Sequence, residues 1–133
     1  MMSGMPNHAI GPVDFVGIPT RDLEAASAFY ADTLGLRRSV YIPDRGFAEF
    51  ETDNLTLSVY NPEQMGMEHN RSPNPIALHV DDVQGAREEF TARGVEFTGE
   101  TLDTGVCHMA FFADPDGNAL MLHGRYAPRA TES

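Results

Sequence analysis

The sequence is short of the features that define several large classes of protein. It has one cysteine, Cys107, so no disulfide can form within the chain, and it has no Cys-x-x-Cys pair. No apolar run approaches the roughly 18 residues that a membrane-spanning helix needs. Residues 1–10 lack the basic start and apolar middle of a signal peptide. These absences predict a cytoplasmic protein with no membrane partner.

Positive charge is also scarce. Lys and Arg total 9 against 20 Asp and Glu, which gives a formal net charge of −11. Because nucleic-acid phosphates and anionic membranes attract basic surfaces, we expect neither as a partner. The negative charge is compatible with a cationic ligand drawn in over long range. It is equally compatible with an acidic surface that serves only solubility.

The rest of the composition is that of an ordinary globular protein. Of 133 residues, 41% are apolar and 22% are charged, which disfavours disordered and fibrous classes. This length predicts a single domain, residues 1–133, that can bury a sizeable core.

The most informative feature present is an internal repeat with a spacing of sixty residues. Val16, Ile18, Asp22, Leu23, Ala26 and Tyr30 recur as Ile76, Leu78, Asp82, Val83, Ala86 and Phe90. Self-similarity of this kind indicates one supersecondary unit used twice. We therefore predict a first module over residues 12–60 and a second over residues 75–126. A polar, proline-rich linker over residues 61–74 connects them.

Each module reads as strand, helix and three further strands, which is an α+β pattern. In both copies an Asp provides a helix N-cap and a Gly follows the apolar helical stripe as a stop signal. The strands are expected at residues 13–18, 39–42, 47–51, 55–60, 76–80, 97–102, 106–112 and 119–125. One helix covers only one face of four strands. We therefore expect two βαβββ modules in a cupped eight-stranded sheet, with the helices on the outer face.

These motifs carry a resemblance to a known family. The first strand followed by Arg21-Asp22-Leu23 and Leu34-Gly35-Leu36, and the later turn Asp114-Pro115-Asp116-Gly117-Asn118, resemble the vicinal oxygen chelate superfamily. This superfamily includes glyoxalase I, extradiol dioxygenases and bleomycin-resistance proteins. The resemblance covers about residues 12–125 and implies the fold and a homodimer. It does not imply one function, because the superfamily hosts very different chemistries.

The resemblance also places the ligands that metal-dependent members use. They are typically a His in the first strand of a module and a carboxylate in its last strand. The matching positions here are Phe15 and Pro75 in the first strands, and Met121 and about Leu57 in the last strands. None offers a nitrogen or hard oxygen ligand. The resemblance therefore implies a cavity that works without a metal.

A cavity of that kind has an apolar lining with a few polar groups. His79 and His123 are expected to face it, because they share strand faces with Pro75 and Met121, whereas the facing of His108 stays open. Arg125 lies on the His123 face and could hold a carboxylate or an aromatic ligand, or pair with surface acids. An alternative is that the apolar members fill a collapsed core. The residues expected to bind ligand are Phe15, Tyr41, Phe47, Leu57, His79, His108, Met121, His123 and Arg125.

Three functions remain open. The first is a metal-independent protein that sequesters a small hydrophobic or aromatic compound, such as an antibiotic, as bleomycin-resistance proteins do. The second is a lyase, isomerase or dioxygenase-like enzyme that uses His79, His108 and His123 as a displaced site, either as bases or with a divalent metal at His79 and His123. The third is an accessory subunit with a vestigial pocket. The loss of every aligned metal ligand favours the first and third.

Overall fold

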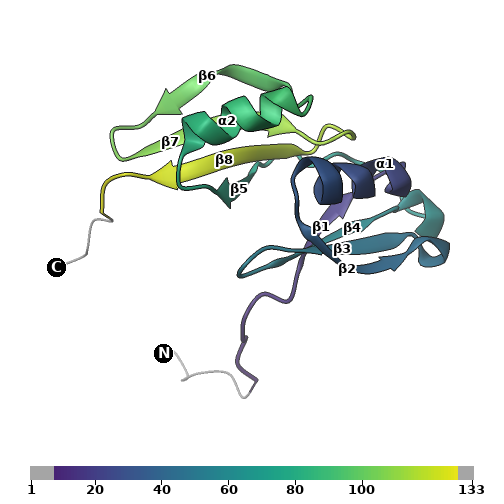
Figure 1. Cartoon of the computed structure of the whole chain (residues 1–133). Coiled ribbons are helices and arrows are strands. Elements are labelled where there is room, and N and C mark those ends of the chain that lie inside the picture. Colours follow the sequence, from purple (N-terminus) through teal and green to yellow (C-terminus); the bar gives the residue numbers. More distant parts are fainter. Residues whose placement is uncertain (1–7, 129–133) are drawn as a thin grey trace.

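The computed structural model describes residues 8–128, which form the two modules (Figure 1). Module 1 consists of β1 (Val16–Pro19), α1 (Leu23–Ala28), η1 (Phe29–Thr33), β2 (Arg37–Ile42), β3 (Phe47–Glu51) and β4 (Thr56–Tyr60). Module 2 consists of β5 (Ile76–His79), α2 (Val83–Ala92), β6 (Phe97–Asp103), β7 (Cys107–Ala113) and β8 (Ala119–Arg125). Two short 3-10 turns are η2 (Pro43–Arg45) and η3 (Glu63–Met65). The α+β class and the two βαβββ modules are confirmed.

Each module forms its own four-stranded mixed sheet. The strand orders are β1-β4-β3-β2 and β5-β8-β7-β6. In each sheet the first strand runs parallel to the last, and the other neighbours are antiparallel. In the described part of the chain no ladder joins β1 to β5. The eight strands are therefore divided between two sheets.

The helices begin and end where the sequence pattern predicts. The carboxylate of Asp22 accepts a hydrogen bond from the Ala25 N–H at 3.1 Å, and Asp82 caps α2 in the same way through Gly85. Gly35 and Gly94 follow the helices with φ of 77° and 100°, a conformation that glycine adopts without steric cost. One difference is that α1 continues as a π-helical segment, η1, where a single regular helix is expected.

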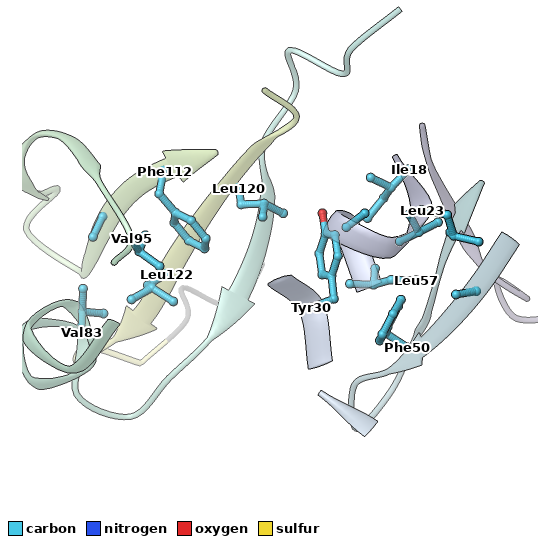
Figure 2. Packing of buried hydrophobic residues seen from close by; sticks show 14 residues of the cluster. Ile18, Leu23, Tyr30, Phe50, Leu57, Val83, Val95, Phe112, Leu120 and Leu122 are labelled. Carbon is cyan, nitrogen blue, oxygen red and sulfur yellow. The ribbon is translucent and has the colours of Figure 1, made fainter. Parts of the chain in front are cut away.

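A single hydrophobic cluster spans both modules (Figure 2). α1 packs on β3 and β4, and α2 packs on β6, β7 and β8. Tyr30 and Phe50 from module 1 are fully buried, with ring centroids 5.5 Å apart. Phe29 carries the cluster across the joint, because its ring lies 6.5 Å from Phe112 of module 2. The two repeats therefore share one core.

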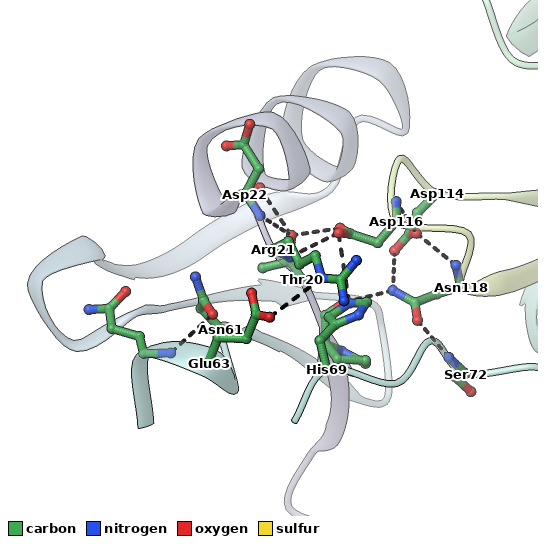
Figure 3. Close-up of polar contacts among 12 residues, drawn as sticks. Thr20, Arg21, Asp22, Asn61, Glu63, His69, Ser72, Asp114, Asp116 and Asn118 are labelled. Atoms are coloured by element: carbon green, nitrogen blue, oxygen red, sulfur yellow. Dashed lines mark hydrogen bonds and ion pairs between the residues drawn. The ribbon is translucent and has the colours of Figure 1, made fainter. Parts of the chain in front are cut away.

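A group of polar contacts fastens the modules together around the turn between β7 and β8 (Figure 3). The Asn118 side-chain amide donates a hydrogen bond of 2.8 Å to the carbonyl of Pro19, the last residue of β1. The Asp116 carboxylate accepts from the Thr20 hydroxyl at 2.6 Å and from the Arg21 N–H at 2.9 Å. From the linker, His69 Nε2 approaches the same carboxylate to 3.8 Å. We call Thr20, Tyr30, Asp114, Asp116 and Asn118 the module clasp.

The buried member of the clasp is the carboxylate of Asp114. Its Oδ2 accepts from the Tyr30 hydroxyl at 2.7 Å and from the Asn118 amide at 2.8 Å. Its Oδ1 accepts from the backbone N–H groups of Asp116 and Asn118. Burial and the adjacent Asp114 charge raise the pKa of Tyr30 well above its usual range, so the phenol remains a donor. A buried carboxylate is tolerated here because donors surround it.

No helix in the described residues is long and apolar enough to cross a membrane.

We expect Tyr30→Phe to lower the free energy of unfolding by about 1–3 kcal/mol, because it removes one donor from a buried carboxylate. Urea denaturation at pH 7 measures the change. The control is Tyr60→Phe, since the Tyr60 hydroxyl makes no side-chain hydrogen bond within residues 8–128. Equal stability of the two variants would contradict the role assigned to the clasp.

Candidate functional site

Each sheet has a helix on one face, whereas its other face carries no helix. Side chains alternate between these faces along every strand. In β8, Leu120 and Leu122 are buried beneath α2, so Met121 and His123 point to the opposite face. In β3, Phe50 is buried beneath α1, so Phe47 and Glu49 point away from it. We call the two helix-free surfaces the open faces, and they are the candidate site.

The open face of module 2 combines imidazole, sulfur and aromatic groups. His79 on β5 is the register partner of His123 on β8, so the two imidazoles are neighbours. Met109 pairs with His123, and Phe111 pairs with Met121. Thioethers and aromatic rings provide an adaptable apolar surface. This face therefore combines apolar contact surface with imidazoles that can form hydrogen bonds.

The open face of module 1 is more acidic. Glu49 lies at the centre of β3, opposite Ser58 on β4, and is half-buried. Glu51 lies at the end of the same strand, and its carboxylate accepts from the hydroxyls of Ser39 at 2.5 Å and Thr56 at 2.6 Å. These two hydrogen bonds, Ser39 first, lower the pKa of Glu51, so it is ionised at neutral pH. The pair can attract a cation.

Sequence reasoning missed both glutamates, although a signal was available. The strand was predicted and Phe47 was assigned to the pocket. Strict alternation from Phe47 then places Glu49 and Glu51 on the same face.

The structure divides the nine predicted site residues between the two sides of the sheets. Phe47, His79, Met121 and His123 lie on the open faces. Phe15 directly precedes β1, is 56% exposed, and by alternation shares the open side with Gly17. Arg125 shares the alternation of His123, but its guanidinium donates to the carbonyls of Ala127 and Pro128.

The other three residues lie on the helix side. Leu57 is fully buried in the core. Tyr41 faces the α1 side, where Arg38 stacks over its ring at 4.2 Å and also donates to Ser27 of α1. His108 lies on the face of Ala110 and Phe112, and its ring centroid is 4.9 Å from that of Tyr126, with the two rings tilted by 36°. Leu57 and Tyr41 therefore lie away from the open faces, Leu57 in the core as the collapsed-core alternative predicts, and His108 does not join the other two histidines.

The strand register of the two sheets corrects the residue that the sequence alignment assigns as the module 1 counterpart of Met121. Leu57 pairs with Val16, as Leu120 pairs with Ile76, so Leu57 is the counterpart of Leu120. The counterpart of Met121 is Ser58, which pairs with Gly17 as Met121 pairs with Ala77. The hydroxyl of Ser58 is a poor ligand for a divalent metal.

The residues at these positions do not fit the metal that the fold family implies. Phe15, Pro75, Ser58 and Met121 supply neither imidazole nor carboxylate. His79 Nε2 is 2.9 Å from Asp81 Oδ1, and His123 is the one other imidazole on that open face. Across residues 8–128 no group of three or more His, Cys, Asp or Glu side chains is arranged to hold a metal ion.

Comparison with known proteins agrees with the fold and the repeat. The family model for the Glyoxalase/Bleomycin resistance protein/Dioxygenase superfamily matches residues 12–122, and the chain belongs to this superfamily. No curated protein matches the sequence.

Several solved structures are similar to this chain. A glyoxalase/bleomycin resistance protein/dioxygenase from Nocardioides has a TM-score of 0.76 and 21% identity, over 96% of this chain and 92% of that chain. The lactoylglutathione lyase of Agrobacterium tumefaciens has a TM-score of 0.73 and 19% identity, over 87% and 95%. These two show the fold. TnmS3, an antibiotic binding protein from Streptomyces sp. CB03234, has a TM-score of 0.74 and 26% identity, over 90% and 99%.

We expect protein purified without chelators or a metal-affinity tag to contain less than one equivalent of zinc, iron or copper per chain, since the donor set is too small. Elemental analysis and calorimetric titration with zinc test this. One equivalent of metal that is lost in His79→Ala and His123→Ala, but retained in the His108→Ala control, would establish a displaced metal site instead.

Proposed function

We propose that this protein is a metal-independent binding protein that sequesters a hydrophobic or aromatic compound, with a cationic antibiotic as the leading class. The observation that carries the proposal is the replacement of all four metal-ligand positions by Phe15, Pro75, Ser58 and Met121. Without those metal ligands, the open faces cannot supply a Lewis acid. They can still supply a surface that contacts a ligand.

The side chains of the open faces support this ligand class. Phe47 and Phe111 offer ring faces, and Met109 and Met121 offer polarisable contact. Glu49 and Glu51 supply negative charge for a ligand cation. TnmS3, at 26% identity, is described as an antibiotic binding protein, which is consistent with the proposal.

A second candidate is an enzyme of the lyase or isomerase type. The arrangement of His79 favours it. The Nε2 atom of His79 lies 2.9 Å from the Asp81 carboxylate, and His79 is the register partner of His123 on the neighbouring strand. A carboxylate can orient an imidazole, so this pair has the parts of a metal-free acid–base site. Turnover that is lost in His79→Ala would favour it over sequestration.

We test the sequestration proposal with a panel of fluorescent aromatic antibiotics, measured by quenching and calorimetry. Glu49→Gln is expected to weaken binding of a cationic compound roughly twofold to fivefold, the size of one partly screened charge contact. The control is Glu88→Gln, which makes the same charge change on the exposed side of α2. A neutral analogue should not distinguish the two variants. Failure of every compound to bind, or equal effects of both substitutions, would contradict the proposal.

The proposal also includes a homodimer in the cytoplasm, the compartment that a chain with a single cysteine suits. Support comes from large apolar side chains that are exposed in the single chain. Val13 is 66% exposed, Phe15 56% and Leu102 49%. A second copy could cover such residues and complete the walls around a ligand.

Sedimentation velocity is expected to show a dimer at micromolar concentration, with Phe15→Glu shifting the protein toward the monomer. The control Glu24→Gln changes an exposed residue on α1 and should leave the dimer intact. A monomer at these concentrations in the unmodified protein would contradict the dimer.

A further inference from the structure

Modules 1 and 2 meet along a joint with two sides, which the internal repeat relates to each other. The contacts on these two sides are not equivalent. On one side, the turn between β7 and β8 closes against β1 through the module clasp (Figure 3). On the other side, the turn between β3 and β4, residues 51–55, faces β5 across a cleft of about 500 Å³. In the described residues no hydrogen bond joins residues 51–55 to residues 76–80. One side of the joint is fastened and the other is open.

The residues that fasten the first side are replaced on the second. Tyr30, which donates to Asp114, has Phe90 as its counterpart, and Phe90 has no hydroxyl. In place of Asp114 and Asn118, the shorter turn offers Asp53 and Asn54, both exposed. Phe90 lines the cleft instead of bridging it. The open cleft is thus a consequence of specific side chains, and not of the fold alone.

One wall of the cleft is the free edge of β5. β5 pairs only with β8, and every residue from Ile76 to Val80 lines the cleft. The Val80 N–H points toward β8, where it bonds the His123 carbonyl at 3.0 Å. Because backbone groups alternate along a strand, the N–H and C=O groups of Ala77 and His79 point to the opposite, unpaired edge. Unpaired strand edges are templates for another extended chain.

The equivalent edge of β1 is protected. Pro19 is the counterpart of His79 and has no N–H to offer, and its carbonyl is already bonded by Asn118. β5 has neither protection, so its edge groups are available for hydrogen bonding.

The remaining walls define what fits beside this edge. The apolar part includes Leu34, Leu36, Leu78 and Phe90. Across from β5 lie Glu51, which the Ser39 and Thr56 hydroxyls hold in place, and the exposed Asp53. Arg37 is the one basic residue other than His79 that lines the cleft. An occupant therefore needs main-chain amides, an aliphatic side chain and a positive charge.

We propose that this cleft binds a short extended peptide with a cationic amino terminus, which adds to β5 as an extra strand. Its amides pair with Ala77 and His79, an aliphatic side chain contacts Leu36 and Phe90, and its amine lies near Glu51 and Asp53. The four residues of β5 span roughly 13 Å, enough for about three or four residues of ligand. The cleft shares Glu51 and His79 with the open faces, but Asp53 lines the cleft and Glu49 does not, so variants at Asp53 and Glu49 distinguish failure of one proposal from failure of the other.

The test uses the peptide Lys-Val-Leu-Val amide with a free amino terminus, titrated into the full-length, isotope-labelled protein and followed by NMR. We expect amide signals of residues 76–80 and 51–55 to shift, with little change at Met121. The Ala77 and His79 amides should exchange with solvent more slowly. A peptide with N-methylated amides should bind at least tenfold more weakly, because it cannot pair with the strand edge.

A charge variant gives an independent measurement. Asp53 is exposed and lines the cleft, so Asp53→Asn is expected to leave the fold intact and to weaken binding of the peptide roughly twofold to fivefold. Asp44→Asn is the matched control in an exposed turn outside the cleft, and Glu49→Gln tests for binding at the open face. Absence of binding at about 1 mM peptide, equal binding of the N-methylated peptide, or shifts confined to the open faces would overturn the proposal.

Discussion

The structure depends on one buried carboxylate, that of Asp114. It accepts hydrogen bonds from the Tyr30 hydroxyl, the Asn118 amide and two backbone N–H groups of its own turn. The bonds to the backbone N–H groups fix the shape of the turn between β7 and β8. The bond from Tyr30 joins that turn to the helical segment of module 1. A buried carboxylate that lost these donors would cost several kcal/mol. The relative placement of the two modules therefore rests on polar contacts as well as on the apolar core.

That placement separates the residues that stabilise the fold from those that we propose to bind a ligand. Residues that hold the fold lie between helix and sheet, as Phe50 and Leu122 do, or within the clasp. Residues that we propose to contact a ligand lie on the opposite sheet faces, as Glu49 and His123 do. Superfamily membership specifies the first set and leaves the second free to differ. The replacement of metal ligands by Phe15 and Met121 is a change of this second kind.

Much of the fold was predictable because its signals are local. The Asp N-caps, the glycine stops and the strand periodicity each involve residues a few positions apart. The joint was not predictable, since Tyr30 and Asp114 are 84 positions apart and no periodicity links them. The site was predictable only in part. An irregularity between Arg38 and Val40 shifts the alternation of β2, which places Tyr41 on the helix side. Leu57 was misaligned by one residue, and a shift of one reverses the face in a strand.

The continuous core has a consequence for how the molecule comes apart. Because Phe29 of module 1 packs against Phe112 of module 2, neither repeat has a complete apolar interior of its own. The duplicated units therefore behave thermodynamically as one cooperative body, in which loosening either half weakens the other. A repeat in sequence has here become a single unit of folding, although its two copies differ within the shared interior, as Tyr30 and Phe90 do.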